Sequence, residues 1–210
     1  MIDLYTWGTP NGRKVSIMLE EVGLPYTVHQ VNIGKGEQHD PAFLKISPNN
    51  RIPAIVDHEG PDGQPISVFE TGAILIYLAE KTGSDLLPRE GRNRVATFEW
   101  LMWQMGGVGP MFGQAHHFLF EPKEVVPYGQ KRYHDETKRL YMVMNDRRLN
   151  ANEYLAGNFY SIADIAVYPW VSRHERHQVD LADYPNVKRW FETVGKREAV
   201  QRGMAVPYLN

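Results

Sequence analysis

The chain has 210 residues, with 23 lysines and arginines against 25 aspartates and glutamates, and it contains no cysteine. This near-neutral charge gives no reason to expect nucleic acid or an anionic membrane surface as a partner. Without cysteine, the chain offers no disulfide, no thiolate zinc site and no thiol nucleophile of its own. It begins with no signal-peptide pattern and holds no apolar stretch of the roughly 18 residues that a membrane span needs, so we expect a soluble cytoplasmic protein.

The N-terminal segment predicts a strand, a helix and a second strand. Residues 2–6 resemble a short strand, and a turn at residues 8–12 begins a helix. Apolar residues then recur at i, i+3, i+4 and i+7 up to Gly23, which is typical of an amphipathic helix. Residues 26–31 indicate the second strand, and after a glycine-rich loop residues 41–46 indicate one short helix.

A hairpin and a further helix follow. Residues 54–57 and 66–69 are strand-length apolar runs, and the turn at residues 60–63 between them predicts an antiparallel hairpin. The helix over residues 71–81 ends at Gly83. A parallel βαβ unit followed by a hairpin and a helix predicts a four-stranded mixed sheet in a thioredoxin-like α/β arrangement.

Beyond a linker at residues 84–91 we find helical periodicity alone. The predicted domains are therefore 1–83, thioredoxin-like, and 92–210, all-helical. Helices are expected at residues 93–118, 127–151, 161–178 and 185–200. The first of these contains several glycines and a proline between residues 106 and 113, so we expect a kink there.

One helix start in the second half is sharply defined. Ser161 stands at the N-cap position and Asp164 three residues later, which is a capping box with aspartate in place of the preferred glutamate or glutamine. Tyr160 and Ile165 flank it as a hydrophobic staple. We interpret this motif as a stability device that begins a buried helix and does no chemistry.

Two segments of the first half point to a ligand site. Ile52–Pro53 precedes an apolar strand, where backbone groups can pair with an extended peptide; an ordinary proline at a strand start is the alternative. Glu70–Thr71 precedes a helix, with Thr71 expected at the N-cap. Its hydroxyl and the first free N–H groups favour a carboxylate, and Glu70 can accept from an ammonium. Simple capping would need only Thr71 and would leave Glu70 unexplained.

Thr9 and Asn11 lie at the start of the first helix and can stabilise a thiolate. Half-ionisation of a free thiol at pH 7 requires about 2 kcal/mol. A helix N-terminus supplies ~0.3–1 kcal/mol and a hydrogen bond to a charged acceptor ~1.5–3 kcal/mol, so no ionisable base is required. A plain helix cap is the alternative for both residues. Tyr5 is a rival thiol activator, although its place in a strand favours a buried aromatic.

These features together resemble the cytosolic glutathione transferases over essentially the whole chain. The segments 9–12 and 47–58 are similar to the nu class, a bacterial group akin to a fungal nitrogen-regulator prion protein. The resemblance implies glutathione or its disulfide as co-substrate, no metal, and a homodimer in which the first domain packs against the partner's helical domain. It also implies that disulfide reduction is favoured over conjugation.

The resemblance also assigns residues. It implies that Thr9 and Asn11 activate the thiol, that the Ile52–Pro53 bond is cis, and that Gln38 reaches the glycyl end of glutathione. It further implies that Arg132 reaches over from the helical domain, where an arginine can grip a carboxylate bidentately; a solvated helix face is the alternative. The predicted glutathione-binding residues are Asn11, Gln38, Ile52, Pro53, Glu70, Thr71 and Arg132.

Two positions depart from the family pattern. Thr71 replaces the usual serine and keeps the hydroxyl, so binding should survive. Trp7 stands where we expect a smaller residue, and it could narrow access to the sulfur. His116 and His117 are interpreted as lining or packing residues, because no acid or cysteine spacing supports a metal site.

The leading prediction is a glutathione-dependent disulfide-bond reductase that uses a bound glutathione thiolate in place of a protein cysteine. Two glutathione molecules, or one glutathione disulfide, would occupy the site together. Conjugation to electrophiles and peroxide reduction are alternatives of the same class. A non-catalytic glutathione-binding regulatory protein on this fold is the alternative of a different class.

Overall fold

The computed structural model describes residues 1–207, which form two compact units. Unit 1 contains residues 1–87 together with residues 197–207, and unit 2 contains residues 88–196. The last helix thus belongs to unit 1, whereas the predicted division assigned it to the helical domain. Within the described residues, no helix combines the length and the apolar character needed to cross a membrane.

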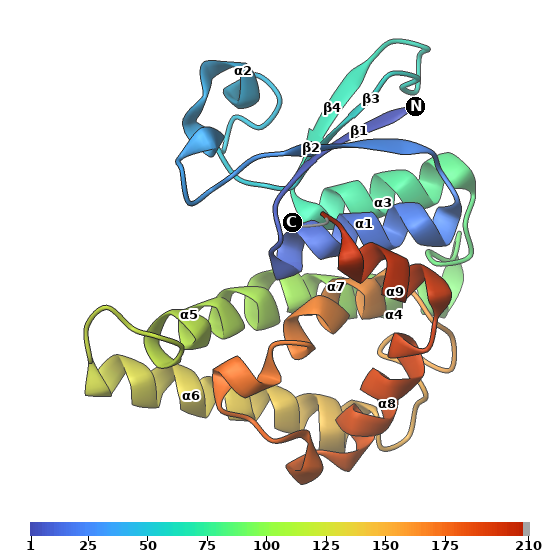
Figure 1. Cartoon of the computed structure of the whole chain (residues 1–210). Helices are drawn as coiled ribbons and strands as arrows, with labels where there is room; N and C mark the ends of the chain where they lie inside the picture. The colour runs from blue at the N-terminus through green and yellow to red at the C-terminus, as the bar shows by residue number, and fades with distance from the viewer. Residues whose placement is uncertain (208–210) are drawn as a thin grey trace. The chain divides into compact units, whose positions relative to one another are not determined.

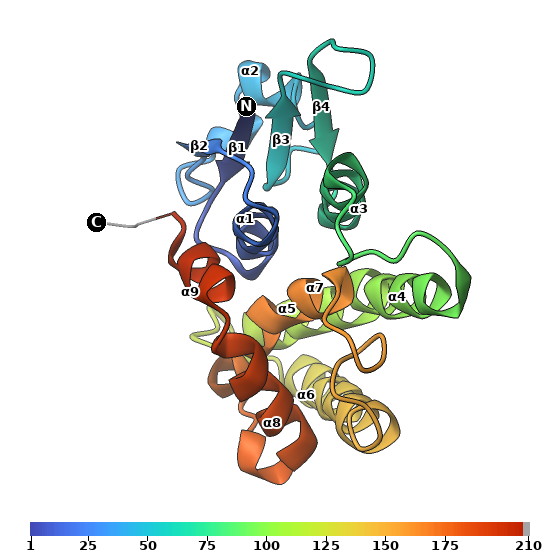
Figure 2. The same cartoon turned by 90° about the vertical axis from the view of Figure 1, so that its right-hand side faces the viewer.

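Unit 1 is built on a four-stranded sheet with the strand order β2-β1-β3-β4 (Figure 1). The strands are β1 (Ile2–Thr6), β2 (Tyr26–Gln30), β3 (Ala54–Asp57) and β4 (Ile66–Phe69). The β1–β2 pair is parallel and the other two pairs are antiparallel, which confirms the predicted mixed sheet. Helices α1 (Pro10–Val22) and α3 (Thr71–Thr82) cover one face, and the short α2 (Pro41–Leu44) lies on the other side (Figures 1 and 2).

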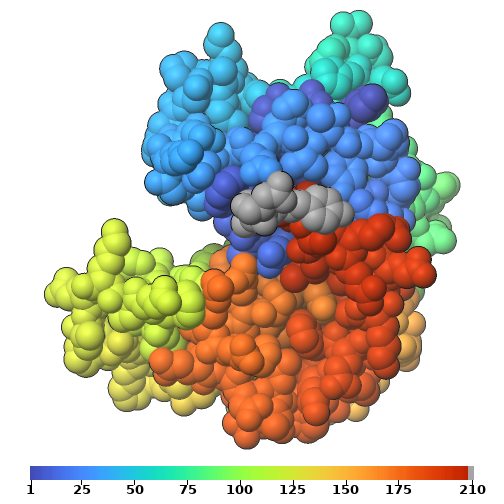
Figure 3. Space-filling model, viewed as in Figure 1, coloured from blue at the N-terminus to red at the C-terminus, as the bar shows by residue number. Residues whose placement is uncertain are grey.

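Two parts of unit 1 stand out on its surface. The segment around α2 and the turn between β3 and β4 form separate projections (Figure 3). That turn closes with a hydrogen bond from the Gly60 N–H to the Gln64 carbonyl at 2.9 Å. The hairpin predicted from the glycines and proline of residues 60–63 is therefore confirmed.

The last helix, α9 (Glu198–Ala205), packs against α1 within unit 1 (Figure 2). A Cβ added to Gly203 would lie 2.5 Å from the backbone of Ile17, so only glycine permits this approach. Ser16 Oγ donates to the Gly203 carbonyl at 2.7 Å. The Arg197 guanidinium donates two hydrogen bonds, of 2.7 and 2.8 Å, to the Glu21 carboxylate. These contacts fix α9 to α1.

This close approach leads to a stability prediction. Gly203→Ala should lower the free energy of unfolding by about 1–3 kcal/mol, because the neighbouring atoms are backbone and cannot rotate away. The melting temperature should fall by about 3–10 °C. Gly106→Ala is the matched control, since nothing lies within 4 Å of its added Cβ. Equal melting temperatures for the two variants would contradict the packing of α9 on α1.

Residues 88–196 of unit 2 contain helices joined by loops and no strand, as predicted. Its main helices are α4 (Gly91–Trp103), α5 (Gly109–Leu119), α6 (Pro127–Met142), α7 (Ile162–Val171) and α8 (Pro185–Gly195). The expected kink in the first long helix is a π-helical turn, Gln104–Val108, that joins α4 to α5. Such wide turns inside helices are a common cause of bends.

Two helices predicted in unit 2 have different limits. The helix expected over residues 161–178 ends at Val171, and a separate 3₁₀ turn follows at His174–His177. The helix expected over residues 185–200 is interrupted at Lys196–Arg197, where the chain passes into α9. Both predicted helices were too long for the same reason, because the apolar spacing of the sequence continues past the residue at which the helix ends.

The capping box at the start of α7 is confirmed. Ser161 Oγ accepts from the Ala163 N–H at 3.2 Å, and Asp164 Oδ2 accepts from the Ser161 N–H at 3.0 Å. Asp164 does more than cap, because its Oδ1 also accepts from the Leu155 N–H at 2.9 Å and from Trp190 Nε1 at 2.8 Å. Burial raises the pKa of the Asp164 carboxyl to about 6. One carboxyl group thus joins α7, the preceding loop and α8.

Candidate functional site

The sheet register brings three chain segments together at one end of the strands of unit 1. Tyr5 of β1 pairs with Ala54 of β3, and Ala54 pairs with Phe69 of β4. Three segments therefore meet at this end of the sheet: the one that leaves β1, the one that enters β3 and the one that leaves β4. They carry six of the predicted site residues: Thr9, Asn11, Ile52, Pro53, Glu70 and Thr71.

The turn into α1 presents two of these residues. Thr9 is the N-cap, and its Oγ1 accepts from the Gly12 N–H at 3.1 Å. A hydroxyl has its own proton to donate as well, so Thr9 can cap the helix and donate to a ligand simultaneously. Asn11 is the second residue of the helix and is half-buried. A Cβ at Gly12 would overlap Thr6 Oγ1 and the carbonyl oxygen of Trp7, so this tight turn requires glycine.

Tyr5 points away from this turn. On β1 the buried residues alternate with half-buried ones, and Tyr5 belongs to the half-buried set. Its ring stacks on His29 with centroids 4.7 Å apart and lies 6.2 Å from the ring of Phe43. Burial raises the pKa of the Tyr5 hydroxyl. This packing favours the strand-aromatic interpretation over the role of thiol activator.

The Ile52–Pro53 segment lies between the loop after α2 and β3. The peptide bond before Pro53 is cis, as expected from the resemblance. Pro53 is buried, and Ile52 lies beyond the end of the β1–β3 ladder, packed on a small apolar cluster with Val31 and Phe43. Ile52 therefore lies just before the start of β3, outside the paired part of the sheet.

Gln38 belongs to a 3₁₀ turn, η1 (Glu37–His39), that is tied to the same loop. Asn50 Nδ2 lies 3.0 Å from His39 Nδ1, which links the turn to the segment before Ile52. The amide oxygen of Gln38 is buried and has no hydrogen-bond partner within residues 1–207. Buried polar atoms are rarely left unpaired in proteins, so this oxygen points to a ligand or an ordered water.

The third segment, Glu70–Thr71, begins α3. The sequence placed Thr71 at the N-cap, but the N-cap residue is Glu70 and Thr71 is the first helical residue. Glu70 has φ 70° and ψ 117°, a conformation that is strained for a residue with a side chain and is typical of functional sites. Its carboxylate is exposed, whereas Thr71 is buried. The first N–H groups of α3 form a positive helix end beside both residues.

Sequence reasoning missed one residue here, Lys14. Its side chain is only 1% exposed, and Nζ donates to Thr71 Oγ1 at 3.2 Å. Burial lowers the pKa of the Lys14 ammonium to about 7, and the charge of Glu70 acts in the opposite direction. The signal was present in the sequence: Lys14 lies three residues after Asn11 and four before Met18, so it shares the predicted apolar face of the helix.

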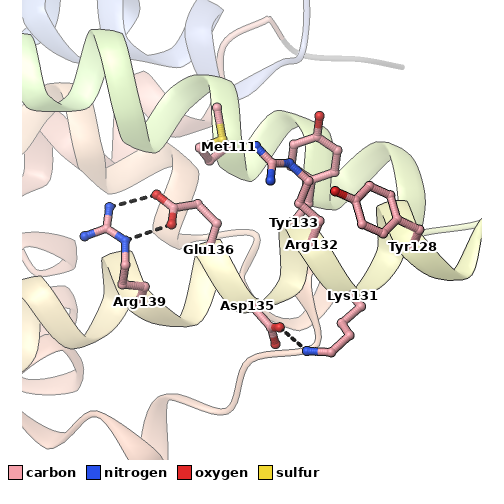
Figure 4. Close-up of a pocket in the computed structure, with 8 residues that line it drawn as sticks. All are labelled: Met111, Tyr128, Lys131, Arg132, Tyr133, Asp135, Glu136 and Arg139. Atoms are coloured by element: carbon pink, nitrogen blue, oxygen red, sulfur yellow. Dashed lines mark hydrogen bonds and ion pairs between the residues drawn. The ribbon is translucent and has the colours of Figure 1, made fainter.

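Arg132, the remaining predicted binding residue, belongs to α6 in unit 2. It lines a pocket of about 740 Å³ that is formed within this unit (Figure 4). The lining residues are Met111, Tyr128, Lys131, Arg132, Tyr133, Asp135, Glu136 and Arg139.

Most of the charged side chains of this pocket form ion pairs, and Arg132 is the exception among the described residues. Arg139 donates twice to the Glu136 carboxylate, at 2.7 Å each, and Lys131 pairs with Asp135 (Figure 4). Arg132 makes no ion pair within the described residues, and its guanidinium lies 6.0 Å from the centre of the Tyr133 ring. Arg132 is thus the cation of this pocket that is best placed to meet an anionic ligand.

His116 and His117 pack among aromatic rings in unit 2. The ring of His116 lies 5.1 Å from that of Phe120 and 6.4 Å from that of His177, and His117 lies 4.9 Å from Phe118. Burial lowers the pKa of the His116 imidazole. Across the part of the chain that the structure describes, no group of three or more potential ligand side chains has the arrangement of a metal site.

Family comparison agrees with this architecture. Residues 9–81 match the model of the glutathione S-transferase N-terminal domain, and residues 108–198 match that of the glutathione S-transferase C-terminal domain. The chain therefore belongs to the glutathione S-transferase family. The predicted resemblance, the thioredoxin-like first half and the helical second half are confirmed.

Individual relatives narrow the comparison. The chain is 53% identical over 211 residues to the disulfide-bond oxidoreductase YfcG of Escherichia coli (strain K12), covering 100% of this chain and 97% of that protein. A Burkholderia graminis glutathione transferase, solved with two glutathione molecules per subunit, is 46% identical with a TM-score of 0.92 over 100% of this chain and 89% of that chain. A Pseudomonas putida glutathione transferase, solved with one glutathione disulfide per subunit, is 45% identical with a TM-score of 0.92, over 98% and 91%.

Proposed function

We propose that this protein is a glutathione-dependent disulfide-bond reductase in which the bound glutathione thiolate does the work of a protein cysteine. The observation that carries the proposal is the N-terminus of α1, where Thr9 and Asn11 offer uncharged donors in a chain that has no cysteine. The name of the Escherichia coli relative and the two forms of ligand in the solved relatives support it. Two glutathione molecules are the reactants of such a reaction, and one glutathione disulfide is its product.

In the proposed complex each part of glutathione has a partner in unit 1. The γ-glutamyl carboxylate lies at Thr71 and the N-terminus of α3, and the γ-glutamyl ammonium lies at Glu70. The cysteinyl backbone pairs with Ile52 beside Pro53, as in strand addition. The glycyl end reaches Gln38. The sulfur then lies toward the start of α1.

The proposed chemistry is two successive thiol–disulfide exchanges. The thiolate of the first glutathione attacks one sulfur of the substrate, forms a mixed disulfide and releases a thiolate that takes a proton from water. The second glutathione attacks the glutathione sulfur of that mixed disulfide, which releases the second substrate thiol and forms glutathione disulfide. Within unit 2, Arg132 and the rings of Tyr128 and Tyr133 would bind an anionic group of an incoming molecule.

A direct assay tests the proposal against its alternatives. Purified protein is given glutathione with 2-hydroxyethyl disulfide, with chlorodinitrobenzene or with a hydroperoxide, and the three turnover rates are compared. We expect disulfide reduction to be the fastest. Much faster conjugation or peroxide reduction would contradict the reductase assignment, and glutathione binding without any turnover would favour a regulatory protein.

We also propose that the protein acts as a homodimer in the cytoplasm, where the glutathione pool is kept reduced. Support for the dimer comes from exposed apolar side chains. Ile66 and Phe69 on β4 are each 36% exposed, and Val95 and Met102 on α4 are 60% and 50% exposed. Val95 and Met102 are seven residues apart and so share one helix face. Exposed apolar side chains on one face of α4 favour an interaction surface.

The dimer proposal has its own test. Met102→Glu should place a charge in the interface and shift the sedimentation of the protein from dimer to monomer. Lys138→Glu, an exposed change of charge on α6, is the control and should remain dimeric. Sedimentation of the wild type as a monomer would rule the proposal out.

A further inference from the structure

Lys14 is an unusual residue in this fold. Lysine is rarely fully buried in proteins, and Lys14 is only 1% exposed in the middle of α1. Its ammonium reaches the beginning of α3 and donates to Thr71 Oγ1. The residue next to Thr71 is the acidic Glu70, whose charge acts on Lys14. A buried cation therefore lies directly behind the residues that we propose hold the γ-glutamyl group.

Packing alone is a poor explanation for this lysine. An apolar side chain of similar length would join α1 to α3 without the cost of taking an ammonium out of water, and such replacements are often neutral or stabilising. Met18, one helical turn after Lys14 on the same face, shows that an apolar side chain fits between these elements, since it is fully buried. The charge of Lys14 is better explained by the groups that its ammonium contacts, and Thr71 Oγ1 is one of them.

The direction of the hydrogen bond from Lys14 to Thr71 indicates what this contact does. A charged ammonium only donates, so Thr71 Oγ1 is the acceptor in this contact and its own proton points away from Lys14. The first N–H groups of α3 lie at the same point and have no partners inside the helix. The ammonium, the helix end and the oriented hydroxyl all favour a negatively charged group at the start of α3.

We propose that Lys14 is a positioning residue for the ligand carboxylate: its buried ammonium orients the Thr71 hydroxyl and adds positive charge behind the N-terminus of α3. This inference rests on the proposed glutathione site. It implies that the protonated form of Lys14 binds the γ-glutamyl carboxylate more tightly than the neutral form.

Several other charged groups around α1 form ion pairs with one another. On α9, Arg197 pairs with Glu21, and Arg202 pairs with Glu20 and with Glu198. On β1, Asp3 contacts His29 and His58, and on α3 Lys81 pairs with Asp57. Glu70 is the acid whose charge raises the pKa of Lys14.

The pH dependence follows from linkage. With a pKa of about 7, Lys14 is partly neutral at physiological pH before the ligand binds. A bound carboxylate raises that pKa, so binding takes up a proton, and the affinity falls as the pH rises through about 7. S-methylglutathione is the proper probe, because it has no thiol whose ionisation would mask the effect.

The experiment is titration calorimetry of S-methylglutathione at several pH values, in buffers with different heats of ionisation. Wild type should take up protons between about pH 6.5 and 8. Lys14→Met, which keeps the length without the charge, should bind about tenfold to a hundredfold more weakly at pH 6.5 and lose the proton uptake. Lys188→Met removes an exposed lysine of α8 and should behave as wild type.

A second ligand separates positioning from a general structural effect. An analogue of S-methylglutathione that lacks the α-carboxylate of its γ-glutamyl group should bind wild type and Lys14→Met with the same affinity. An equal loss of affinity for both ligands in Lys14→Met would overturn the inference.

Three results with wild-type protein also decide the matter, so a variant that does not fold is no obstacle. Equal affinity of wild type for S-methylglutathione and for the analogue that lacks the α-carboxylate would overturn the role of Lys14, and binding without proton uptake would overturn the pH dependence inferred for it; both results leave glutathione binding intact. No binding at all would overturn the glutathione site itself, and with it the inference.

Discussion

Asp164→Ala should lower the free energy of unfolding by about 3–4 kcal/mol and the melting temperature by about 10 °C. The substitution leaves three buried donors without an acceptor, namely the N–H groups of Leu155 and Ser161 and the indole Nε1 of Trp190. Each buried donor without a partner costs about 1–3 kcal/mol. Thermal unfolding followed by circular dichroism measures the effect.

The control for this prediction is another aspartate that caps a helical turn. Asp180 accepts a single hydrogen bond from the Ala182 N–H at 2.8 Å and is exposed. Asp180→Ala should therefore cost only about 0.5–1 kcal/mol. Equal losses at the two positions would mean that Asp164 acts as a simple cap, and the described network would be wrong.

The same carboxyl group should produce a pH dependence of stability. Its folded-state pKa of about 6 lies above the ordinary value of 3.8, so the native state holds this proton more tightly than the unfolded chain does. The resulting stabilisation is complete below about pH 4 and is lost as the pH rises through about 6. In Asp164→Asn, which does not titrate, this fall should disappear from urea-unfolding curves recorded across that interval.

Thr9→Ala should lower kcat/KM for disulfide reduction by about tenfold to a hundredfold, because a hydrogen bond to a charged sulfur contributes about 1.5–3 kcal/mol. The reaction should also require a higher pH, since the pKa of the bound thiol rises toward ~8.5 when the donor is lost. Asn11→Ala should act in the same direction. The pH–rate profile with 2-hydroxyethyl disulfide measures both effects.

Thr9→Ser is the matched control for the hydroxyl. Serine retains both the cap to the Gly12 N–H and the donor, so this variant should keep most of the activity. A loss as large as that of Thr9→Ala would show that the methyl group, and not the hydroxyl, is what the reaction needs. An unchanged pH profile in Thr9→Ala would contradict the thiolate role.

The elements that could be predicted are those with local causes. The limits of α1 follow from Thr9, Pro10 and Gly23, which act on their own neighbours in the chain. The β3–β4 hairpin follows from its turn residues in the same way. The interruption near Lys196 could not be seen, because α9 is placed by contacts such as that between Ser16 and Gly203, which are 187 residues apart.

The same distinction between local and distant causes applies to the residues of the site. Glu70 and Thr71 could be recognised from the sequence because a helix start has a local signature, although their order at the N-cap was wrong. The burial of Lys14 depends on α3, so spacing along α1 could only suggest it. Gln38 and Arg132 were named by resemblance alone, since nothing around either residue in the sequence indicates a ligand.

The packing of α9 on α1 also bears on how the protein is made. The helix that completes unit 1 leaves the ribosome after unit 2, so the sheet and the other helices of unit 1 lack this cover while unit 2 is synthesised. A fragment cut at the linker, however natural that boundary looks in the sequence, would never contain its own final helix. Unit 1 is therefore completed only after unit 2 has been synthesised.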